Sequence, residues 1–292
     1  MAGWRERSEL DLDFNPKSEI MHLLSTWLKG EEKALQRFSM LGSGAQDNLS
    51  HRSDSEPLMD SSLLREEIAS FGASLVGFAD IREFVPWPQA ISIALALDPV
   101  IMKGVKNGPT PEYYQEYTRA NTMLNEIAQR TARLLLGAGY RAEAFPATIA
   151  ASDKLQGYER TLRAAFQHKT AATRAGLGFI GKSGLLTTPD FGPRLRLVTV
   201  FTDLPFPTGQ PILEGRCGCC RLCVEACPVG AIKGREWRAG MAREELLDAR
   251  ACRREAKRLL KERVGADEVV CGICVAICPC GQMVSANPQE DS

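Results

Sequence analysis

All ten cysteines of this chain lie between Cys217 and Cys280, and the preceding residues contain none. The N-terminal sequence has no apolar stretch of the kind that signal peptides carry. In a chain that is not exported, clustered cysteines are more often metal ligands than disulfides. We therefore expect a cytoplasmic protein in which a cysteine-free body is followed by a short metal-binding module.

The first half of this module spaces four cysteines as CxxCxxCxxxCP, which is the spacing of bacterial [4Fe–4S] ferredoxins. Its members are Cys217, Cys220, Cys223 and Cys227. In such a run three thiolates hold one cluster, and the fourth, beside the proline, holds the neighbouring cluster. A second copy, CxxCxxxCP, contains one cysteine fewer, and its members are Cys271, Cys274 and Cys278. Cys252, between the two copies, is available to complete the second set.

The crossed ferredoxin rule predicts two sets of four ligands. The first set is Cys217, Cys220, Cys223 and Cys278, and the second is Cys227, Cys252, Cys271 and Cys274. Cys219 and Cys280 are left over and are interpreted as bystander thiols. Zinc is the alternative, but it needs only four ligands per site and gives no reason for a CxxCxxC run that ends in Cys-Pro.

The overall charge balance excludes several kinds of partner. Lys and Arg number 36 and Asp and Glu number 36, so no global charge favours nucleic acid or an anionic membrane. The longest apolar stretch, residues 90–97, is far shorter than the ~20 residues that span a bilayer. We expect no membrane partner.

The chain divides into three parts. Residues 17–41 have the apolar spacing of a helix, and a polar run leads from Gly42 to Pro57. A well-formed domain is expected from Met59. The predicted division is a helical appendage with a linker over 1–58, an α/β body over 59–210, and a ferredoxin-like double [4Fe–4S] domain over 211–292.

Helix and strand patterns alternate along the body. Asp60 is an N-cap candidate for a helix that ends near Gly72. Helices are expected over 111–135 and 162–174, and strands over 75–79, 90–97, 140–145 and 194–202. The near-continuous apolarity of 90–97 predicts a strand that is buried on both faces. The fold class expected is α+β, with an α/β sandwich as the body.

A glycine-rich segment in the body matches two nucleotide-binding patterns, GxxxxGK[ST] and GxGxxG, through Gly176, Gly178, Gly181 and Lys182. Both patterns require a strand before the loop and a helix after it. Here a helix precedes the loop and a strand follows, so nucleotide binding is not favoured. The segment is expected to be a tight turn at a helix C-terminus, or a place where backbone approaches a flat cofactor. Lys182 is a candidate anchor for an anionic group.

Residues 233–268 are strongly charged around an apolar stripe that includes Leu246 and Leu260. A solvated amphipathic helix explains this pattern. A docking face for RNA or for an acidic redox partner is the alternative.

Several of these features occur together, and in this order, in one known family. Residues 175–182 (AGLGFIGK), Thr202-Asp203-Leu204, the CxxCxxCxxxCP run, Leu247-Asp-Ala-Arg-Ala-Cys252 and the closing CxxCxxxCP resemble epoxyqueuosine reductases, which share their architecture with reductive dehalogenases. The resemblance covers residues 60–281. It implies a corrinoid-reductase-like body that binds cobalamin, two clusters that reduce its cobalt, and Cys252 as the displaced ligand. It also implies an external low-potential electron donor of the ferredoxin or flavodoxin type, with a small molecule, a modified nucleoside or tRNA as substrate.

Two departures from this family predict a shorter paralogue with its own substrate. The family's acidic proton donor would fall at Leu162, with Asp153 and Glu159 out of register, and the chain ends soon after the second motif. His168 becomes the proton-donor candidate because its pKa suits transfer near neutral pH, and a structural histidine is the alternative. A non-catalytic electron carrier and a tRNA epoxyqueuosine reductase proper are the alternative functions.

Overall fold

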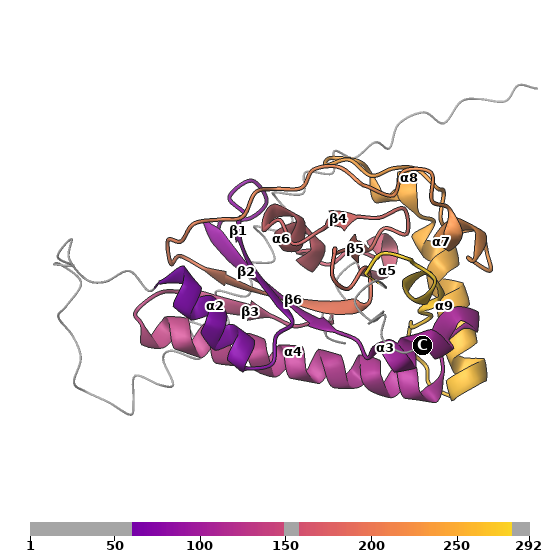
Figure 1. Cartoon of the computed structure of the whole chain (residues 1–292), viewed down its shortest axis with the longest axis horizontal. Helices are drawn as coiled ribbons and strands as arrows, with labels where there is room; N and C mark the ends of the chain where they lie inside the picture. The colour runs from indigo at the N-terminus through magenta and orange to yellow at the C-terminus, as the bar shows by residue number, and fades with distance from the viewer. Residues whose placement is uncertain (1–59, 149–157, 282–292) are drawn as a thin grey trace, which may run out of the picture. The chain divides into compact units, whose positions relative to one another are not determined.

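The computed structural model describes residues 60–148 and 158–281 (Figure 1). The helix and linker predicted within residues 1–58, and Asp153, lie outside these ranges. The described residues belong to one compact unit. Within the described ranges, no helix is both long and apolar enough to cross a bilayer.

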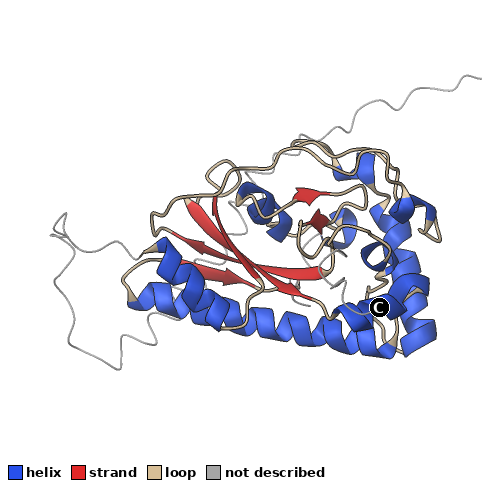
Figure 2. Ribbon diagram, in the orientation of Figure 1, coloured by secondary structure: helices blue, strands red, loops and turns tan. Residues whose placement is uncertain are grey.

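A four-stranded antiparallel sheet forms the centre of the body (Figure 2). Its strands are β1 (Leu75–Asp80), β2 (Gln89–Ala96), β6 (Leu195–Thr202) and β3 (Ala142–Phe145), in that spatial order. All three pairings are antiparallel. The four predicted strands are therefore confirmed to within two residues, and β2 is buried along its whole interior, as its apolarity predicted.

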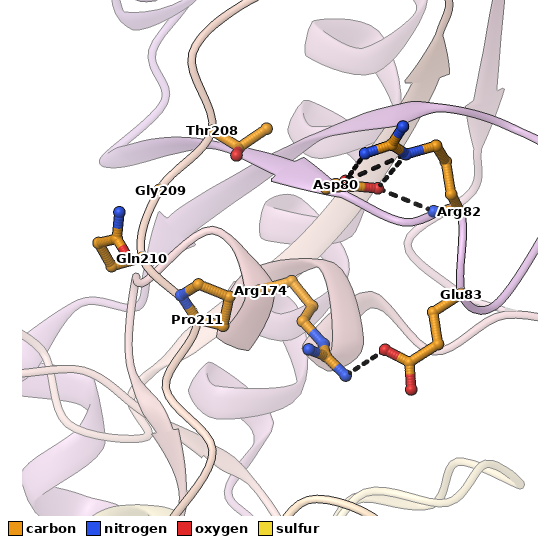
Figure 3. A pocket seen from close by; sticks show the side chains of 8 residues that line it. All are labelled: Asp80, Arg82, Glu83, Arg174, Thr208, Gly209, Gln210 and Pro211. Atoms are coloured by element: carbon orange, nitrogen blue, oxygen red, sulfur yellow. Dashed lines mark hydrogen bonds and ion pairs between the residues drawn. The ribbon is translucent and has the colours of Figure 1, made fainter.

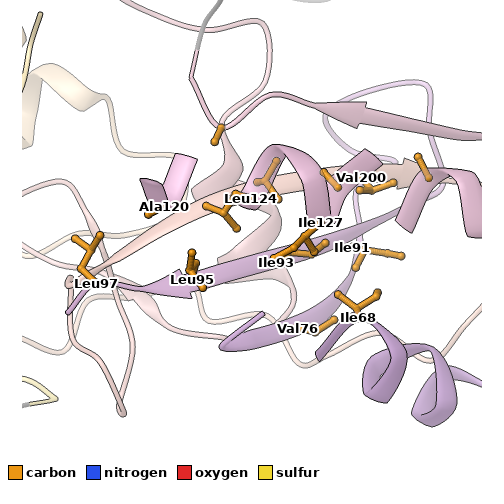
Figure 4. Close-up of a cluster of buried hydrophobic side chains, with 14 of the residues drawn as sticks. Ile68, Val76, Ile91, Ile93, Leu95, Leu97, Ala120, Leu124, Ile127 and Val200 are labelled. Carbon is orange, nitrogen blue, oxygen red and sulfur yellow. The ribbon is translucent and has the colours of Figure 1, made fainter. Parts of the chain in front are cut away.

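Two helices pack on one face of this sheet. Helix α2 (Ser61–Ser70) begins at Asp60, whose carboxylate accepts a hydrogen bond from the backbone N–H of Ser62 (2.7 Å). Helix α4 (Pro111–Gly137) begins at Thr110 and runs beneath the sheet (Figure 1). Their apolar sides meet the alternate residues of β1, β2 and β6 that point to this face (Figure 4). The members labelled there include Ile68, Ile91, Ile93, Leu124, Ile127 and Val200.

The opposite face of the sheet carries small side chains on β2 and the larger Phe201 on β6, and one short helix packs on it. Helix α6 (His168–Arg174) shares buried clusters with this face, Ala171 with Ala90 and Ala172 with Ala94. The prediction of a helix over 162–174 is wrong in its first half. Only α5 (Tyr158–Thr161) precedes α6, because Leu162 adopts a left-handed backbone conformation (φ 52°) that interrupts the helix.

The cysteine-bearing segment is built from short helices. They are α7 (Leu222–Glu225), α8 (Arg243–Leu246), α9 (Ala249–Val264) and α10 (Ile273–Ala276). Helix α10 packs on α3 (Pro99–Lys103) and on the 3₁₀ turn η2 (Gly104–Asn107). Leu260, Val270 and Ala276 belong to the same buried cluster as α4. The cysteine segment and the sheet therefore share one core.

Candidate metal centre

Each cysteine motif contains a one-turn helix that is entered differently. In the second motif Gly272 (φ 84°) directly follows Cys271 and is the N-cap of the helix, whereas in the first Gly218 (55°) follows Cys217 and the helix begins four residues later, after Arg221. Helices α7 and α10 are these two helices, and they pack against each other. The two cysteine motifs, which are separate in the sequence, therefore lie next to each other in the folded chain.

The four thiols of the second predicted set converge. Burial, together with the charges of Cys271 and Cys227, raises the pKa of Cys252 to about 11. Burial also raises the pKa of Cys274, and Cys271, Cys252 and Cys227 act on it in the same direction. Metal binding would reverse these shifts, because metal ligands are thiolates. These thiols, from three segments far apart in sequence, lie near one another, and the charge of Cys223 from the first predicted set also acts on Cys274.

In the first predicted set, the three cysteines of the first motif come together. Burial raises the pKa of Cys223, and the charges of Cys217 and Cys220 add to this effect. From the second motif, it is Cys280 whose charge acts on Cys217. Burial raises the pKa of Cys278 to about 12, and the charge of Cys280 acts in the same direction. The structure thus places Cys280, a bystander in the sequence interpretation, beside the predicted fourth ligand.

Among residues 60–148 and 158–281, no three His, Cys, Asp or Glu side chains lie close enough to hold one ion.

Lys182 connects the body to the first motif. It lies in the loop between the short strands β4 (Phe179–Ile180) and β5 (Leu186–Thr187), and it is 6% exposed. Its Nζ donates to the carbonyl oxygens of Gly218 (2.5 Å) and Cys220 (3.0 Å). Its backbone N–H points at the Sγ of Cys217 (3.5 Å). The predicted anchor for an anionic group is therefore buried against the cysteine motif.

Arg194 makes the corresponding connection to the second motif. Its side chain is 8% exposed and donates to the carbonyl oxygens of Cys278 (2.9 Å) and Cys280. Gly192 lies against the same carbonyl of Cys280, and a Cβ at that position would collide with it. Sequence reasoning missed Arg194, because a basic residue at the start of a strand carries no signal of burial.

The three predicted cofactor-binding glycines serve close packing of the chain. A Cβ on Gly176 would lie 2.7 Å from the carbonyl oxygen of Gln210, and one on Gly178 would collide with the carbonyl of Thr187. A Cβ on Gly181 would lie 2.9 Å from Oγ1 of Thr187 and 3.5 Å from the sulfur of Cys217. Helix α6 precedes this segment, β4 lies within it and β5 follows it, so the inverted context that argued against nucleotide binding is confirmed.

His168, the predicted proton donor, begins α6 with both ring nitrogens hydrogen-bonded. Its Nε2 donates to the carbonyl oxygen of Pro146 (2.9 Å), so its Nδ1 accepts from the hydroxyl of Thr199 (2.8 Å). Burial lowers the pKa of His168 to about 4, which keeps the ring neutral. The neutral ring has no N–H to spare, and this geometry favours the structural alternative.

The neighbouring Lys169 has a more labile proton. Its Nζ donates to the carbonyl oxygen of Gly184 in the glycine loop (2.7 Å). Burial, together with the positive charges of Arg243 and Arg163, lowers the pKa of Lys169 to about 8. A buried lysine that titrates this close to neutral pH can act as an acid. Sequence reasoning missed it because burial of a lysine leaves no mark in the sequence pattern.

The segment 158–163, which contains Leu162, is tied to the cysteine segment. Arg243 donates to the carbonyl oxygens of Thr161 (2.8 Å) and Leu162 (2.6 Å), and Arg253 pairs with Glu159 (2.5 Å). These contacts hold Leu162 in its left-handed conformation. The place where the family's acidic residue was expected is therefore fixed by arginines of α8 and α9.

Much of the charge on α9 is neutralised locally. Arg258 pairs with Glu255 (2.6 Å) and with Glu262 (2.6 Å), and Lys257 pairs with Asp267 (3.1 Å). The predicted amphipathic helix is confirmed, and its internal ion pairs favour a solvated face over a docking face for RNA.

A polar pocket of about 470 Å³ opens where β1 and α6 end (Figure 3). Two ion pairs occupy its rim, Arg82 with Asp80 (2.5 Å) and Arg174 with Glu83 (2.7 Å). Its other lining residues are Thr208, Gly209, Gln210 and Pro211. None of the site residues predicted from the sequence lines this pocket.

Comparison with known proteins identifies the type of metal centre. Residues 216–281 match the family described as "4Fe-4S double cluster binding domain". The cysteine segment is therefore a binding segment for two [4Fe–4S] clusters, as the spacing predicted, and the zinc alternative is set aside.

The chain also resembles known reductases. A segment of 119 residues is 34% identical to epoxyqueuosine reductase of Bacillus anthracis and covers 38% of this chain, but only 28% of that protein. The chain superposes on a reductive dehalogenase whose structure "suggests a mechanism for B12-dependent dehalogenation" (TM-score 0.57, 21% identity, 81% of this chain and 34% of that one). It also superposes on an epoxyqueuosine reductase in complex with a modified tRNA stem loop (TM-score 0.51, 20% identity, 76% and 65%). The predicted resemblance is confirmed, and these superpositions establish the fold.

Proposed function

We propose that this protein is an iron–sulfur oxidoreductase in which two [4Fe–4S] clusters deliver electrons to an acceptor bound by the body. The observation that carries this proposal is the contact of Lys182 with the first cysteine motif. A buried loop of the body touches a predicted cluster ligand directly. A cluster held there would contact the body through buried groups that are shielded from water. A free-standing electron carrier would not need such a contact.

The ligands proposed for the cluster beside the body are Cys217, Cys220, Cys223 and Cys278, and those for the other are Cys227, Cys252, Cys271 and Cys274. When bound, each cluster accepts and passes on single electrons. The part of these residues is to hold the sulfurs in fixed positions and to exclude water. We also retain the proposed boundary near residue 210 between an α/β sandwich body of the corrinoid-reductase type and the cluster segment.

Cobalamin is the proposed acceptor. Its support is the likeness of this fold to a dehalogenase that is described as B12-dependent. Gly176 and Gly178 do not open space for a cofactor where a Cβ would stand, because the backbone of other segments already fills that space. No reaction step is therefore assigned to these glycines, and the role proposed for Lys182 is at the cluster.

Reduction of a substrate also consumes protons, and two neighbouring residues are candidates to supply them. His168 is the candidate from the sequence, and it would have to give up its hydrogen bond to Pro146. Lys169 needs no such rearrangement, since its pKa already lies at about 8. We propose a small molecule or a modified nucleoside as substrate, with a ferredoxin- or flavodoxin-type protein as electron donor.

Anaerobic reconstitution tests this function. The chain is loaded with iron and sulfide, incubated with hydroxocobalamin, desalted and reduced with a low-potential reductant. We expect about one corrinoid per chain and a Co(I) absorption spectrum. The matched control is the Cys217→Ser/Cys220→Ser variant, which should retain corrinoid but form Co(I) much more slowly. Eight irons per chain with no retained corrinoid would instead favour the ferredoxin-type carrier.

A tRNA epoxyqueuosine reductase is the second function to be tested. Its support is the fold shared with an enzyme described in complex with a modified tRNA stem loop. Expression in a strain that lacks this activity distinguishes the two substrates. Restored queuosine in tRNA would establish the tRNA substrate, and its absence, with the protein holding both clusters, would leave the shorter-paralogue proposal.

A further inference from the structure

Two buried cations of the body both face the cluster proposed to lie beside it. Lys182 (6% exposed) donates to carbonyls of the first motif, and Arg194 (8% exposed) donates to carbonyls of the second. The two motifs meet at this cluster, because its proposed ligands are Cys217, Cys220 and Cys223 from one and Cys278 from the other. The body therefore places one buried cation against each of the two motifs that would supply ligands to this cluster.

The other cluster has different surroundings. The charge of Asp248 acts on Cys252, and the charge of Glu255 acts on Cys271, with Arg263 opposing it. Beside Gly272 in the second motif lie the neutral side chains of Val105 and the buried Tyr113. Carboxylates and neutral groups thus face one set of thiols, whereas buried cations face the other.

A carboxylate also lies near Lys182 and has to be weighed. Glu236 accepts a hydrogen bond from the backbone N–H of Cys217 (2.8 Å), and its other oxygen is 3.8 Å from the Nζ of Lys182. The Glu236 side chain is 37% exposed, whereas that of Lys182 is 7% exposed. Both charges act on the Cys217 thiol, the carboxylate more strongly than the ammonium, so Lys182 offsets part of the negative charge of Glu236 there. The Arg194 guanidinium donates its hydrogen bonds to the backbone carbonyls of Cys278 and Cys280.

We propose that Lys182 and Arg194 raise the reduction potential of the cluster beside the body and thereby set the direction of electron flow between the two clusters. A reduced cluster carries one more negative charge than an oxidised one, and a cation fixed in a low-dielectric interior stabilises that charge. The backbone N–H of Lys182 directed at the Cys217 sulfur acts in the same sense. This inference rests on the proposed function, since it assumes the two ligand sets given there.

The electron balance is simple. A low-potential one-electron donor reduces the cluster of Cys227, Cys252, Cys271 and Cys274 first. One electron then moves to the cluster between Lys182 and Arg194, which is reduced by one charge as the first is reoxidised. No bond forms or breaks, and no proton is required in this step.

Redox titration of the reconstituted holoprotein, followed by electron paramagnetic resonance, tests the inference. The wild type should show two one-electron waves. In Lys182→Met and in Arg194→Met the same wave, the one at higher potential, should move down. We expect the midpoint potential of this wave to fall by about 59 mV. For one electron this shift lowers the ratio of reduced to oxidised cluster at the wild-type midpoint about tenfold. Lys182→Arg and Arg194→Lys keep the charge and should restore most of the potential.

Two further variants make the result decisive. Lys257→Met removes an exposed cation of α9 and should move neither wave. Cys252→Ser should leave a single wave, and adding Lys182→Met should shift that remaining wave. If Cys252→Ser keeps both waves and eight irons, the ligand assignment of the proposed function fails, while the Lys182 shift still reports on the cation.

Unmoved waves in both methionine variants, with eight irons present, would overturn the inference, and so would equal shifts of both waves. If one methionine variant loses iron, the other still carries the test, since it contacts the other motif. Loss of iron in both would show that the two cations only hold the motifs in place, which would also overturn the tuning role.

Discussion

The Nζ of Lys182 lies 3.0 Å from the carbonyl oxygen of Cys220, so a buried ammonium of the body holds the loop that presents the first cysteine motif. The sequence marks this lysine only as the end of a glycine-rich pattern. Its position makes it part of the metal centre, and the centre is assembled by the body as much as by the cysteine segment.

Replacement of Cys252 tests the completion of the second ligand set. Cys252→Ser should lower the iron content from about eight to about four per chain, because one of two [4Fe–4S] clusters loses a ligand. Iron analysis with visible absorption measures the loss. Cys219→Ser is the matched control, since Cys219 is exposed and was left over by the spacing. An unchanged iron content in Cys252→Ser would refute the assignment.

The fourth ligand of the first set is tested by the pair Cys278 and Cys280. The crossed ferredoxin rule selects Cys278, whereas Cys280 is the thiol whose charge acts on Cys217. Cys278→Ser should cost one cluster and Cys280→Ser none. Mössbauer spectra measure the number of clusters in each variant. Loss of a cluster in Cys280→Ser but not in Cys278→Ser would assign the fourth ligand to Cys280.

A Cβ on Gly178 would collide with the carbonyl of Thr187. Gly178→Ala should therefore destabilise the fold by about 2 kcal/mol through overpacking, seen as a lower Tm in a thermal scan. Gly137→Ala, at the end of α4 where a Cβ meets open space, is the control and should leave the Tm unchanged or slightly raised. Normal stability with lost corrinoid in Gly178→Ala would instead indicate a cofactor contact.

The pKa of His168 predicts a dependence of stability on pH. Burial lowers it from 6.5 to about 4 in the folded chain, so between these values the unfolded state binds a proton that the folded state does not. Stability should therefore rise with pH from about 4 to 6.5 and be fully present above that range. The contribution is at most about 3 kcal/mol.

Thermal scans at pH 5 and pH 7 measure this effect. The wild type should lose more Tm at pH 5 than His168→Gln does, because glutamine does not titrate. An identical loss in both proteins would show that His168 does not control the acid sensitivity.

Arg243 fastens the segment around Leu162 through two carbonyl contacts. Arg243→Ala should release the segment and raise tryptic cleavage after Arg160 and Arg163 by at least about tenfold, because each of the two charge-assisted hydrogen bonds contributes about 1.5–3 kcal/mol. Mass spectrometry of timed digests measures the rates. The exposed Arg238, replaced by alanine, serves as control. Equal rates in all three proteins would show that the contact does not hold the segment.

Sequence patterns were reliable where short-range geometry sets the structure. The strands at 75–79 and 90–97 follow from apolar runs, and α4 follows from Pro111 and its helical spacing. The first half of the helix predicted over 162–174 failed because Leu162 takes a left-handed conformation, which contacts with Arg243 stabilise. No local pattern encodes a contact between residues that are 81 positions apart.

For the metal centre, the sequence by itself determined the cluster type, since the CxxCxxCxxxCP spacing is fixed by how closely neighbouring thiolates can surround one cluster. Only the tertiary structure decided what surrounds it. Lys182 and Cys220 are 38 residues apart, and Arg194 and Cys278 are 84 apart. Covalent spacing controls ligands within one turn of chain, whereas packing of the shared core determines which charges lie beside them, and these charges govern the energy of an electron on the cluster.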